Sequence, residues 1–382
     1  MYMLRNFLDK IKPHFGKDGK LHFLHSTFEA FESFLYVPDK VTVSGCHVRD
    51  ALDMKRTMIM VVFALLPCFL FGIYNTGFMH FSALGETRDF WPTFWFGCTK
   101  VLPMLIVSYV VGLGIEFIFA QVRGHEVNEG FLVSGFLIPL ICPPDVPLWM
   151  VGVATAFAVI IGKEVFGGTG MNIWNPALLA RAFLFFAYPS RMSGDSVWVA
   201  DAVSGPTALS HIASGATDAV PSVSQLFWGF IPGSVGETSK FCILIGAAIL
   251  LWSGIGSFRI MFSAVAGAGL MAWIGHQTGA TDATMIQHLL SGGFLFGAVF
   301  MATDPVTSAQ TQAGKWIFGF LVGVMAMVIR IFNPAYPEGM MLAILLMNTF
   351  APLIDYLVVN RNISRRKKRL RMASEPSAVV NS

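Results

Sequence analysis

The sequence predicts an all-α polytopic membrane protein with about ten transmembrane helices, arranged as two inverted five-helix repeats that include half-helices. The first observation is composition: of 382 residues, 54% are hydrophobic and only 13% are charged, whereas soluble chains carry about 25% charged residues. The second is the grouping of these apolar residues into runs that approach the length needed to cross a bilayer. The third is a pair of motifs that recurs at matched spacing in both halves.

The N-terminal region, residues 1–56, is too polar to lie inside a bilayer. Within it, Phe7, Leu8, Ile11 and Phe15 recur at helical spacing among charged residues. This pattern predicts a short amphipathic helix that lies on a membrane or on a partner protein.

Ten apolar segments follow, and several are shorter than the roughly 20 residues that a helix needs to cross the hydrocarbon. Short spans interrupted by Gly or Pro are typical of half-helices whose broken backbone lines an internal site. The first five segments form the repeat 57–188 and the last five form the repeat 240–359. The expected spans are 57–76, 99–120, 128–142, 147–163, 175–188, 240–253, 258–275, 286–302, 315–332 and 339–359.

The repeat is visible in the sequence alone. Each copy contains a Gly-Phe-Leu run, then an Asp beside prolines, then Asn-Pro-Ala at the start of the next apolar segment. Because each half holds an odd number of helices, the second half must be inserted upside down, which places a site near the mid-plane between the repeats. The paired motifs are 135–137 and 293–295, Asp145 and Asp304, and 175–177 and 333–335.

Orientation follows from the basic tail, residues 360–382. Lysine and arginine concentrate on the cytoplasmic side of membrane proteins, so the tail is expected there, and an even number of spans places the N-terminus on the same side. The loop 189–239 is then periplasmic. The basic residues of the tail are Arg361, Arg365, Arg366, Lys367, Lys368, Arg369 and Arg371.

Several ionisable residues lie in or beside the apolar segments, where a charge is costly unless it is paired or hydrated. Glu116 and Asp355 have no oppositely charged neighbour in the sequence, which favours a path for Na+ or H+. Lys163, Glu164 and Glu338 lie near the ends of spans, and for these an ion pair between helices or a position at the level of the lipid headgroups is the favoured interpretation. The remaining candidates of this kind are Arg181, Asp304 and Arg330.

The polar interruption in the middle of the chain contains a turn of small residues around Thr207. Its hydroxyl is exposed enough to accept a covalent group, although local composition alone also fits an ordinary loop.

A second candidate segment contains the glycines of 167–170 followed by Asn172 and Asn175. The glycines let the backbone approach a planar ligand closely, and the side-chain amides can form hydrogen bonds to the edge of a flavin ring. The alternative is that this segment is only a turn that ends a helix.

The five scattered cysteines form no CxxC pair, so we expect no metal cluster within this chain.

Longer motifs resemble a known family. The sequence is similar to the B-type membrane flavoprotein subunits of Na+-translocating NADH:quinone oxidoreductases, which are related to the D-type subunits of the Rnf complexes. The similarity runs from the N-terminal region to the basic tail. The motifs that carry it are HEVNEGF at 125–131, GKEVFGGTG at 162–170, NPAL at 175–178, RAFLFFAYP at 181–189, MATDPV at 301–306, NPAYPEGMMLAIL at 333–345 and FAPLID at 350–355.

The resemblance implies that a flavin transferase attaches FMN to a threonine through a phosphoester bond. Asp201, Ser204 and Gly205 match the family's attachment motif, and Thr207 occupies the position of the modified threonine. Thr217 is the rival, because Ser-Gly-Ala directly precedes it.

The resemblance also implies the remaining sites. An unmodified riboflavin would be held by Asn172 and Asn175. Quinone would bind near Gly112, Gly130 and Phe131, and Na+ would pass Glu116, Asp304 and Asp355. The chain would then be one of about six subunits of a complex in the bacterial inner membrane.

The expected activity is therefore electron transfer from covalent FMN through riboflavin to quinone, coupled to Na+ export. One alternative is the D-type subunit of an Rnf-type ferredoxin:NAD oxidoreductase, which shares the flavin-bearing threonine. Another is a solute channel or transporter without flavin, because inverted five-helix repeats also build such proteins.

Overall fold

The computed structural model describes residues 2–15, 28, 32, 43–46, 54–86, 88–123, 130–192, 197–201, 206–333, 336 and 338–374. Within these residues the regular structure is helical and contains no strand, which confirms the all-α class. The first helix, α1 (Tyr2–Phe15), confirms the helix expected in the N-terminal region.

The helices of the first half are α3 (Met54–Ala83), α4 (Phe90–Arg123), α5 (Phe131–Leu140), α6 (Leu148–Gly162), α7 (Pro176–Ala187) and α8 (Pro189–Met192). The middle region contains α9 (Ala208–Ala213) and α10 (Val223–Trp228). The helices of the second half are α11 (Lys240–Trp252), α12 (Phe258–Gln277), α13 (Met285–Leu290), α14 (Phe294–Phe296), α15 (Gln312–Phe332) and α16 (Met340–Ser374).

Six helices of the described part of the chain are long and apolar enough to cross a membrane: α3, α4, α6 with the turn after it, α12, α15 and α16. Three apolar helices are shorter, namely α5, α7 and α11. The prediction that 128–142 and 175–188 contain short helices is therefore confirmed.

One expected span, 286–302, is not a continuous helix. It is divided into α13, the turn Ser291–Gly293, α14 and a π-helical turn at Gly297–Met301. The break has a local cause, because Ser291 is extended and Gly292 has a φ of +61°. That left-handed backbone conformation is open to glycine and costly for other residues. The prediction of a single span here is therefore wrong.

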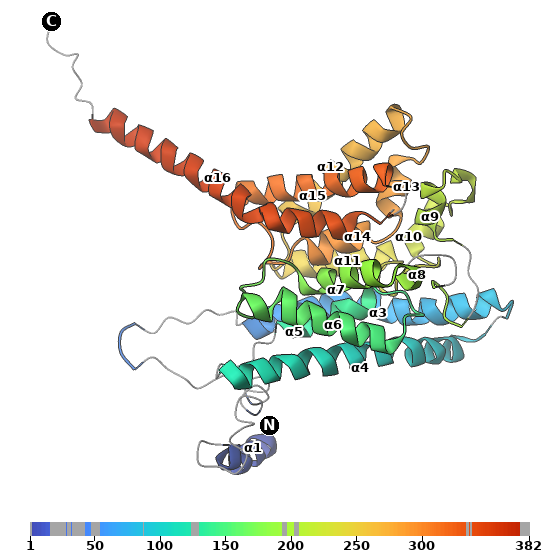
Figure 1. Ribbon diagram of the computed structural model, residues 1–382, viewed down its shortest axis with the longest axis horizontal. Coiled ribbons are helices and arrows are strands. Elements are labelled where there is room, and N and C mark those ends of the chain that lie inside the picture. The colour runs from blue at the N-terminus through green and yellow to red at the C-terminus, as the bar shows by residue number, and fades with distance from the viewer. Residues whose placement is uncertain are drawn as a thin grey trace, which may run out of the picture.

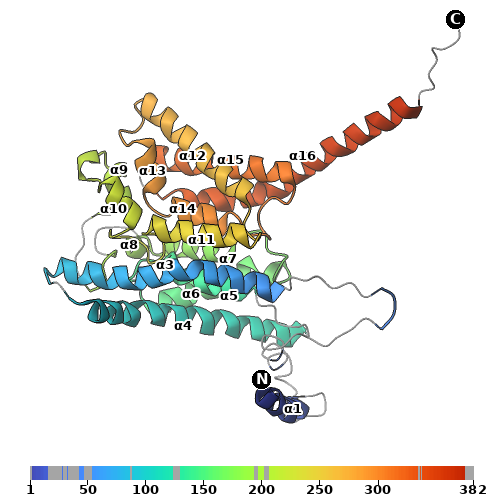
Figure 2. The ribbon, with the colours of Figure 1, turned by 180° about the vertical axis from the view of Figure 1, so that it is seen from behind.

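The long helices lie in two layers (Figures 1 and 2). Helices α3 to α7 form one layer, α12, α15 and α16 form the other, and α11 and α14 lie between them (Figure 1). Helix α3 begins, and α16 runs out of the bundle, at the same end. Helices α9 and α10 lie at the opposite end.

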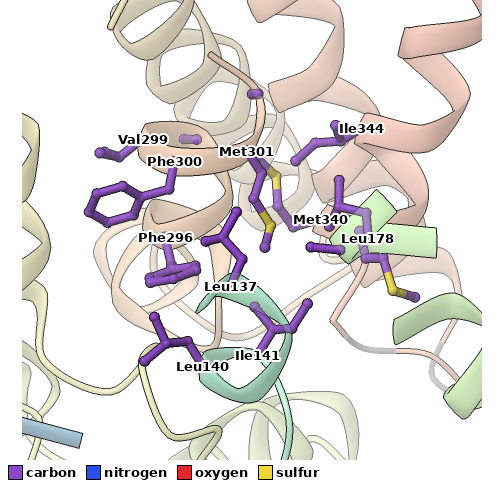
Figure 3. Close-up of a cluster of buried hydrophobic side chains, with 14 of the residues drawn as sticks. Leu137, Leu140, Ile141, Leu178, Phe296, Val299, Phe300, Met301, Met340 and Ile344 are labelled. Carbon is purple, nitrogen blue, oxygen red and sulfur yellow. The ribbon is translucent and has the colours of Figure 1, made fainter. Parts of the chain in front are cut away.

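The middle of the bundle is a cluster of buried apolar side chains in which the two Gly-Phe-Leu segments meet (Figure 3). Leu137 and Leu140 of α5 lie beside Phe296 of α14 and Phe300 of the π-helical turn. Met340 of α16 belongs to the same cluster of buried apolar side chains. Segments at equivalent places in the two sequence repeats therefore pack together at the centre.

Helix crossings rely on glycines, as expected where lipid rather than water surrounds the helices and close packing drives association. A Cβ atom on Gly323 of α15 would lie 2.0 Å from the carbonyl oxygen of Ala264 in α12. A Cβ atom on Gly246 of α11 would lie 2.4 Å from the carbonyl oxygen of Ala64 in α3. These pairs of helices are thus held at distances that a larger residue would not permit.

We predict that Gly323→Ala lowers the thermal stability of the detergent-solubilised protein, because the new methyl group meets backbone atoms that must move. Overpacking of this kind costs about 1–3 kcal/mol. Gly114→Ala is the matched control, since a Cβ atom on Gly114 of α4 meets nothing within 4 Å, and alanine has the higher helix propensity. Equal melting temperatures for the two variants would contradict this description of the α12–α15 crossing.

Candidate functional site

A first cavity, which we call the Asn172 cavity, lies at the end of the bundle where α3 begins. The empty space between its walls, counted out to where it opens to solvent, is about 750 Å³. Both halves of the chain line it, so the structure brings together four of the residues expected from the sequence to bind riboflavin, quinone or Na+. Its polar and small lining residues include Thr57, Gly130, Ser134, Lys163, Thr169, Asn172, Asn175, Thr303 and Asp304.

The two asparagines have different roles. The side-chain oxygen of Asn175 accepts hydrogen bonds from the backbone N–H groups of Ala177 (3.0 Å) and Leu178 (3.4 Å), so it caps α7. Pro176 occupies the first turn of this helix, where its missing N–H costs nothing. Asn172 donates to the carbonyl oxygen of Trp174 at 3.0 Å. Asn175 therefore fixes the cavity wall, while the carbonyl oxygen of the Asn172 side chain remains a candidate acceptor for a ligand.

Asp304 joins the second half of the chain to this wall. Its carboxylate accepts hydrogen bonds from the backbone N–H of Val306 (3.2 Å) and the hydroxyl of Thr307 (2.9 Å). It also accepts one from the side-chain amide of Asn175 (3.4 Å). The carboxylate thus links the Asn-Pro-Ala motif of the first repeat to the Asp of the second.

Glu116 and Lys163 form a buried ion pair beside the Asn172 cavity. Each residue is only 4% exposed. The sequence offers Glu116 no nearby cation, but folding brings Lys163 to it from 47 residues away. Glu164, the next residue, pairs with Arg123 at 3.3 Å. The ion-pair interpretation of Lys163 and Glu164 is confirmed.

Asp355 lies elsewhere, at the N-terminus of α15. Its carboxylate accepts hydrogen bonds from the backbone N–H groups of Gln310 (2.6 Å) and Thr311 (2.9 Å), and from the Thr311 hydroxyl (2.6 Å). A carboxylate at this position also interacts favourably with the helix dipole. Of the three acids expected along a Na+ path, only Asp304 lines the Asn172 cavity. Glu116 lies behind Lys163, which lines the cavity. Asp355 belongs to α16 and accepts hydrogen bonds at the start of α15.

The three residues expected near quinone do lie together. Phe131, the first residue of α5, is fully buried. A Cβ atom on Gly112 of α4 would lie 1.9 Å from the tip of its ring. A Cβ atom on Gly130 would lie 2.5 Å from the methyl group of Thr169. Glycine at both positions therefore makes room for the start of α5 beside the Asn172 cavity.

A second cavity, which we call the Thr207 cavity, lies toward the opposite end of the bundle, where α9 begins (Figures 1 and 2). It contains about 670 Å³ of empty space. Thr207 lines it and caps α9, because its hydroxyl oxygen accepts a hydrogen bond from the Ser210 backbone N–H at 3.3 Å. Thr217 instead begins the 3-10 helix Thr217–Ala219 and does not line this cavity.

The start of the attachment motif is held against the first half. Asp201 has a φ of +54° and forms an ion pair with Lys100 of α4. The ring Nδ1 of His80 in α3 lies 2.8 Å from the carbonyl oxygen of Ala200. The other two motif residues, Ser204 and Gly205, lie outside the described residues.

Charged side chains from both halves line the Thr207 cavity. Arg181 of α7 forms an ion pair with Glu338, which precedes α16, and donates to the Ser234 hydroxyl at 3.1 Å. Lys240 is 1% exposed and donates to the carbonyl oxygens of Glu237 (2.6 Å) and Gly292 (3.0 Å). The ion-pair interpretation of Glu338 is confirmed.

Sequence reasoning missed Glu237 and Lys240. Glu237 lies in the polar segment before α11, where burial raises the pKa of its carboxyl to about 7 despite the nearby Arg181. The available signal was a Glu and a Lys within four residues of one another, directly before an apolar run. Two buried cations, two carboxyl groups and two threonines, Thr207 and Thr238, therefore line the Thr207 cavity.

We predict that Arg181→Met strongly destabilises the protein, because it leaves Glu338 without its cation in a poorly solvated site. Loss of one partner of a buried pair costs about 3–5 kcal/mol. The double variant Arg181→Met/Glu338→Gln should recover part of this loss. Arg259→Met, at an exposed arginine of α12, is the control and should change little. Thermal unfolding in detergent measures the stability of all three variants. If Arg181→Met were no less stable than Arg259→Met, the buried ion pair would not stabilise the fold as described.

Both cavities fit a flavin by the chemistry of their walls. A threonine hydroxyl at the wall of the Thr207 cavity offers an attachment point for a phosphoester. Arg181 and Lys240 can interact with its negative charge, although Glu237 and Glu338 line the same cavity. The Asn172 cavity offers an amide, a lysine and small residues, which suit a flat ring bearing carbonyl groups but no phosphate. The fold and these cavities define a polytopic membrane protein with a cavity toward each end of its bundle, and each cavity has charged and polar side chains in its wall.

Comparison with known proteins identifies the family to which this membrane protein belongs. The sequence matches the NQR2, RnfD, RnfE family over residues 41–364. The chain belongs to this family.

Curated relatives cover nearly the whole chain. The protein of Chromohalobacter salexigens that is named as the B subunit of Na(+)-translocating NADH-quinone reductase is 48% identical over 396 residues, with 96% of each chain covered. Proteins of the same name from Stutzerimonas stutzeri and Pseudomonas paraeruginosa are 46% and 45% identical, covering 96% of this chain and 99% of their own. The similarity inferred from the short motifs is therefore confirmed.

Proposed function

We propose that this chain is the membrane redox subunit of a Na+-translocating NADH:quinone reductase. It passes electrons from FMN bound covalently to Thr207, through riboflavin in the Asn172 cavity, to quinone, and this transfer is coupled to Na+ export. The observation that carries the proposal is the pair of cavities, one with a threonine hydroxyl among cations and the other with an amide and a lysine. The name shared by relatives over 96% of the chain supports it.

At the Thr207 cavity, the oxygen of the threonine side chain would hold FMN through a phosphoester bond, and Asp201, Ser204 and Gly205 would be the residues that a flavin transferase recognises. Arg181 and Lys240 stabilise negative charge in this cavity. Flavins supply the ability to exchange electrons one at a time, while the protein sets spacing and polarity. The pairing of Asp201 with Lys100 holds the start of the motif beside α4.

At the Asn172 cavity, Asn172 binds the polar edge of riboflavin, and Asn175 holds the wall against which the ring lies. Quinone binds nearby, at the contact of Gly112, Gly130 and Phe131. Both ligands are planar rings with carbonyl groups, so amide and backbone donors suit both.

Na+ is carried past Glu116, Asp304 and Asp355, whose carboxylate oxygens are hard ligands suited to this ion. Asp304 is the member of this set that lines the Asn172 cavity. The coupling of Na+ movement to electron transfer would therefore take place beside riboflavin.

The chain lies in the bacterial inner membrane with ten membrane segments, of which 286–302 is a broken one, in two inverted repeats, 57–188 and 240–359. Both termini are cytoplasmic and the flavin loop is periplasmic. The emergence of α16 at the end where α3 begins supports this arrangement, and so do the basic residues of the tail. The partners are the other subunits of a complex of about six.

The D-type subunit of an Rnf-type complex is the second candidate, because the matched family description includes RnfD. The long N-terminal region and the relatives named as B subunits of the reductase favour the quinone reductase. Membranes that oxidise NADH with quinone in a Na+-stimulated manner would agree with the first candidate. Membranes that instead need ferredoxin would agree with the second.

We predict that Thr207→Ala abolishes the in-gel flavin fluorescence of this chain, because the phosphoester can no longer form. Thr217→Ala is the matched control and should keep the fluorescence of the parent chain. Electrophoresis under denaturing conditions followed by ultraviolet illumination measures both variants. Fluorescence that persists in Thr207→Ala and disappears in Thr217→Ala would transfer the attachment site to Thr217.

A further inference from the structure

Lys163 lies between the Asn172 cavity and Glu116. It lines the cavity, and its ammonium group donates to the carboxylate of Glu116. Glu116 is not among the residues that line this cavity. The lysine therefore has one charged partner behind the wall and a ligand-sized space in front of it.

The position of this lysine has an electrostatic consequence. An unpaired ammonium group is costly to bury, and Glu116 offsets much of that cost. Electrostatic interactions in such poorly solvated sites are stronger than in water. Negative charge that arrives in the cavity therefore interacts strongly with this ammonium group.

The other charged residue at the cavity wall faces different partners. Asp304 accepts three hydrogen bonds, from Val306, Thr307 and Asn175, and its charge is negative. Among the described residues that line the cavity, Lys163 is the one cationic side chain.

We propose that the ammonium group of Lys163 stabilises the reduced form of the flavin in the Asn172 cavity, and that Glu116 is the positioning residue that holds this lysine in place. The inference rests on the proposed function. An electron that came from the covalently bound FMN would add one negative charge to the ring, and Lys163 would interact with that charge until the electron passed on to quinone. Lys163 keeps its proton throughout, so no bond to hydrogen is made or broken at this residue.

This assignment gives Glu116 a second role besides its place on the proposed Na+ path. Its carboxylate interacts with Lys163 in the structure, so removing it acts through the lysine. Variants of the two residues should then have similar effects on the flavin, and the double variant should be no worse than the lysine variant alone. If Glu116 acted on Na+ alone, its substitution would leave the flavin potential unchanged, and the effects of the two residues would be independent.

The test compares Lys163→Met, Glu116→Gln and the double variant in the intact, purified complex. Spectroelectrochemistry gives the midpoint potential of the non-covalent flavin, and extraction gives its content. We expect Lys163→Met to lower the preference for reduced over oxidised flavin about tenfold, which is about 59 mV for a one-electron couple. Glu116→Gln should shift the potential in the same direction by less. Lys163→Arg keeps the charge and should restore most of the potential.

Arg123→Met is the matched control, because Arg123 pairs with the adjacent Glu164, is 37% exposed and does not line the cavity. It should leave the potential unchanged. If Lys163→Met loses the flavin while covalent FMN is retained and Lys163→Arg regains it, the cation is required for binding, and this result also supports the inference.

An unchanged potential in Lys163→Met with the flavin still bound would overturn the inference. So would a Glu116→Gln variant that changes the Na+ dependence of turnover but leaves the potential as it was. Asn172→Leu separates these failures from failure of the proposed function. If that variant keeps all its non-covalent flavin, riboflavin does not bind in this cavity. If it loses the flavin while Lys163→Met shows no shift, only the role of Lys163 is wrong.

Discussion

The contact between Arg181 and Glu338 is the interaction on which much of this structure depends. Arg181 lies in α7 of the first half, and Glu338 lies 157 residues later, just before α16. A buried charge must be paired or it strongly destabilises the fold. The pair therefore ties the two halves together beside the Thr207 cavity, and Ser234 extends the tie to the segment before α11.

Broken helices create the space that these charges surround. α5 and α7 are short, and the segment from α13 to Met301 is divided by a turn and a π-helical turn. Their apolar side chains pack together at the centre (Figure 3), so each cavity lies to one side of this packed region. Helix ends also bring capping residues to the walls, as Asn175 and Thr207 show. The same feature thus supplies both the cavities and their polar groups.

Sequence reasoning was most successful where the signal was local. Asn-Pro-Ala correctly indicated the start of α7. The three glycines of 167–170 lie in a turn beside the Asn172 cavity, and all three have positive φ angles, from +91° to +118°. The sequence could not identify contacts between distant residues, such as Lys163 with Glu116 or Arg181 with Glu338. It also treated 286–302 as one helix, because apolar composition outweighed the Ser-Gly-Gly break.

The central claim is that the two cavities hold two different flavins, covalently bound FMN at Thr207 and non-covalently bound riboflavin in the Asn172 cavity. Flavin analysis of the purified chain within its complex tests it most directly: acid precipitation, then visible spectra and chromatography of pellet and supernatant. We expect one FMN per chain to remain with the precipitate and one riboflavin to be released. A colourless chain, or one with a single flavin species, would contradict the claim, and a colourless chain would favour a flavin-free channel or transporter.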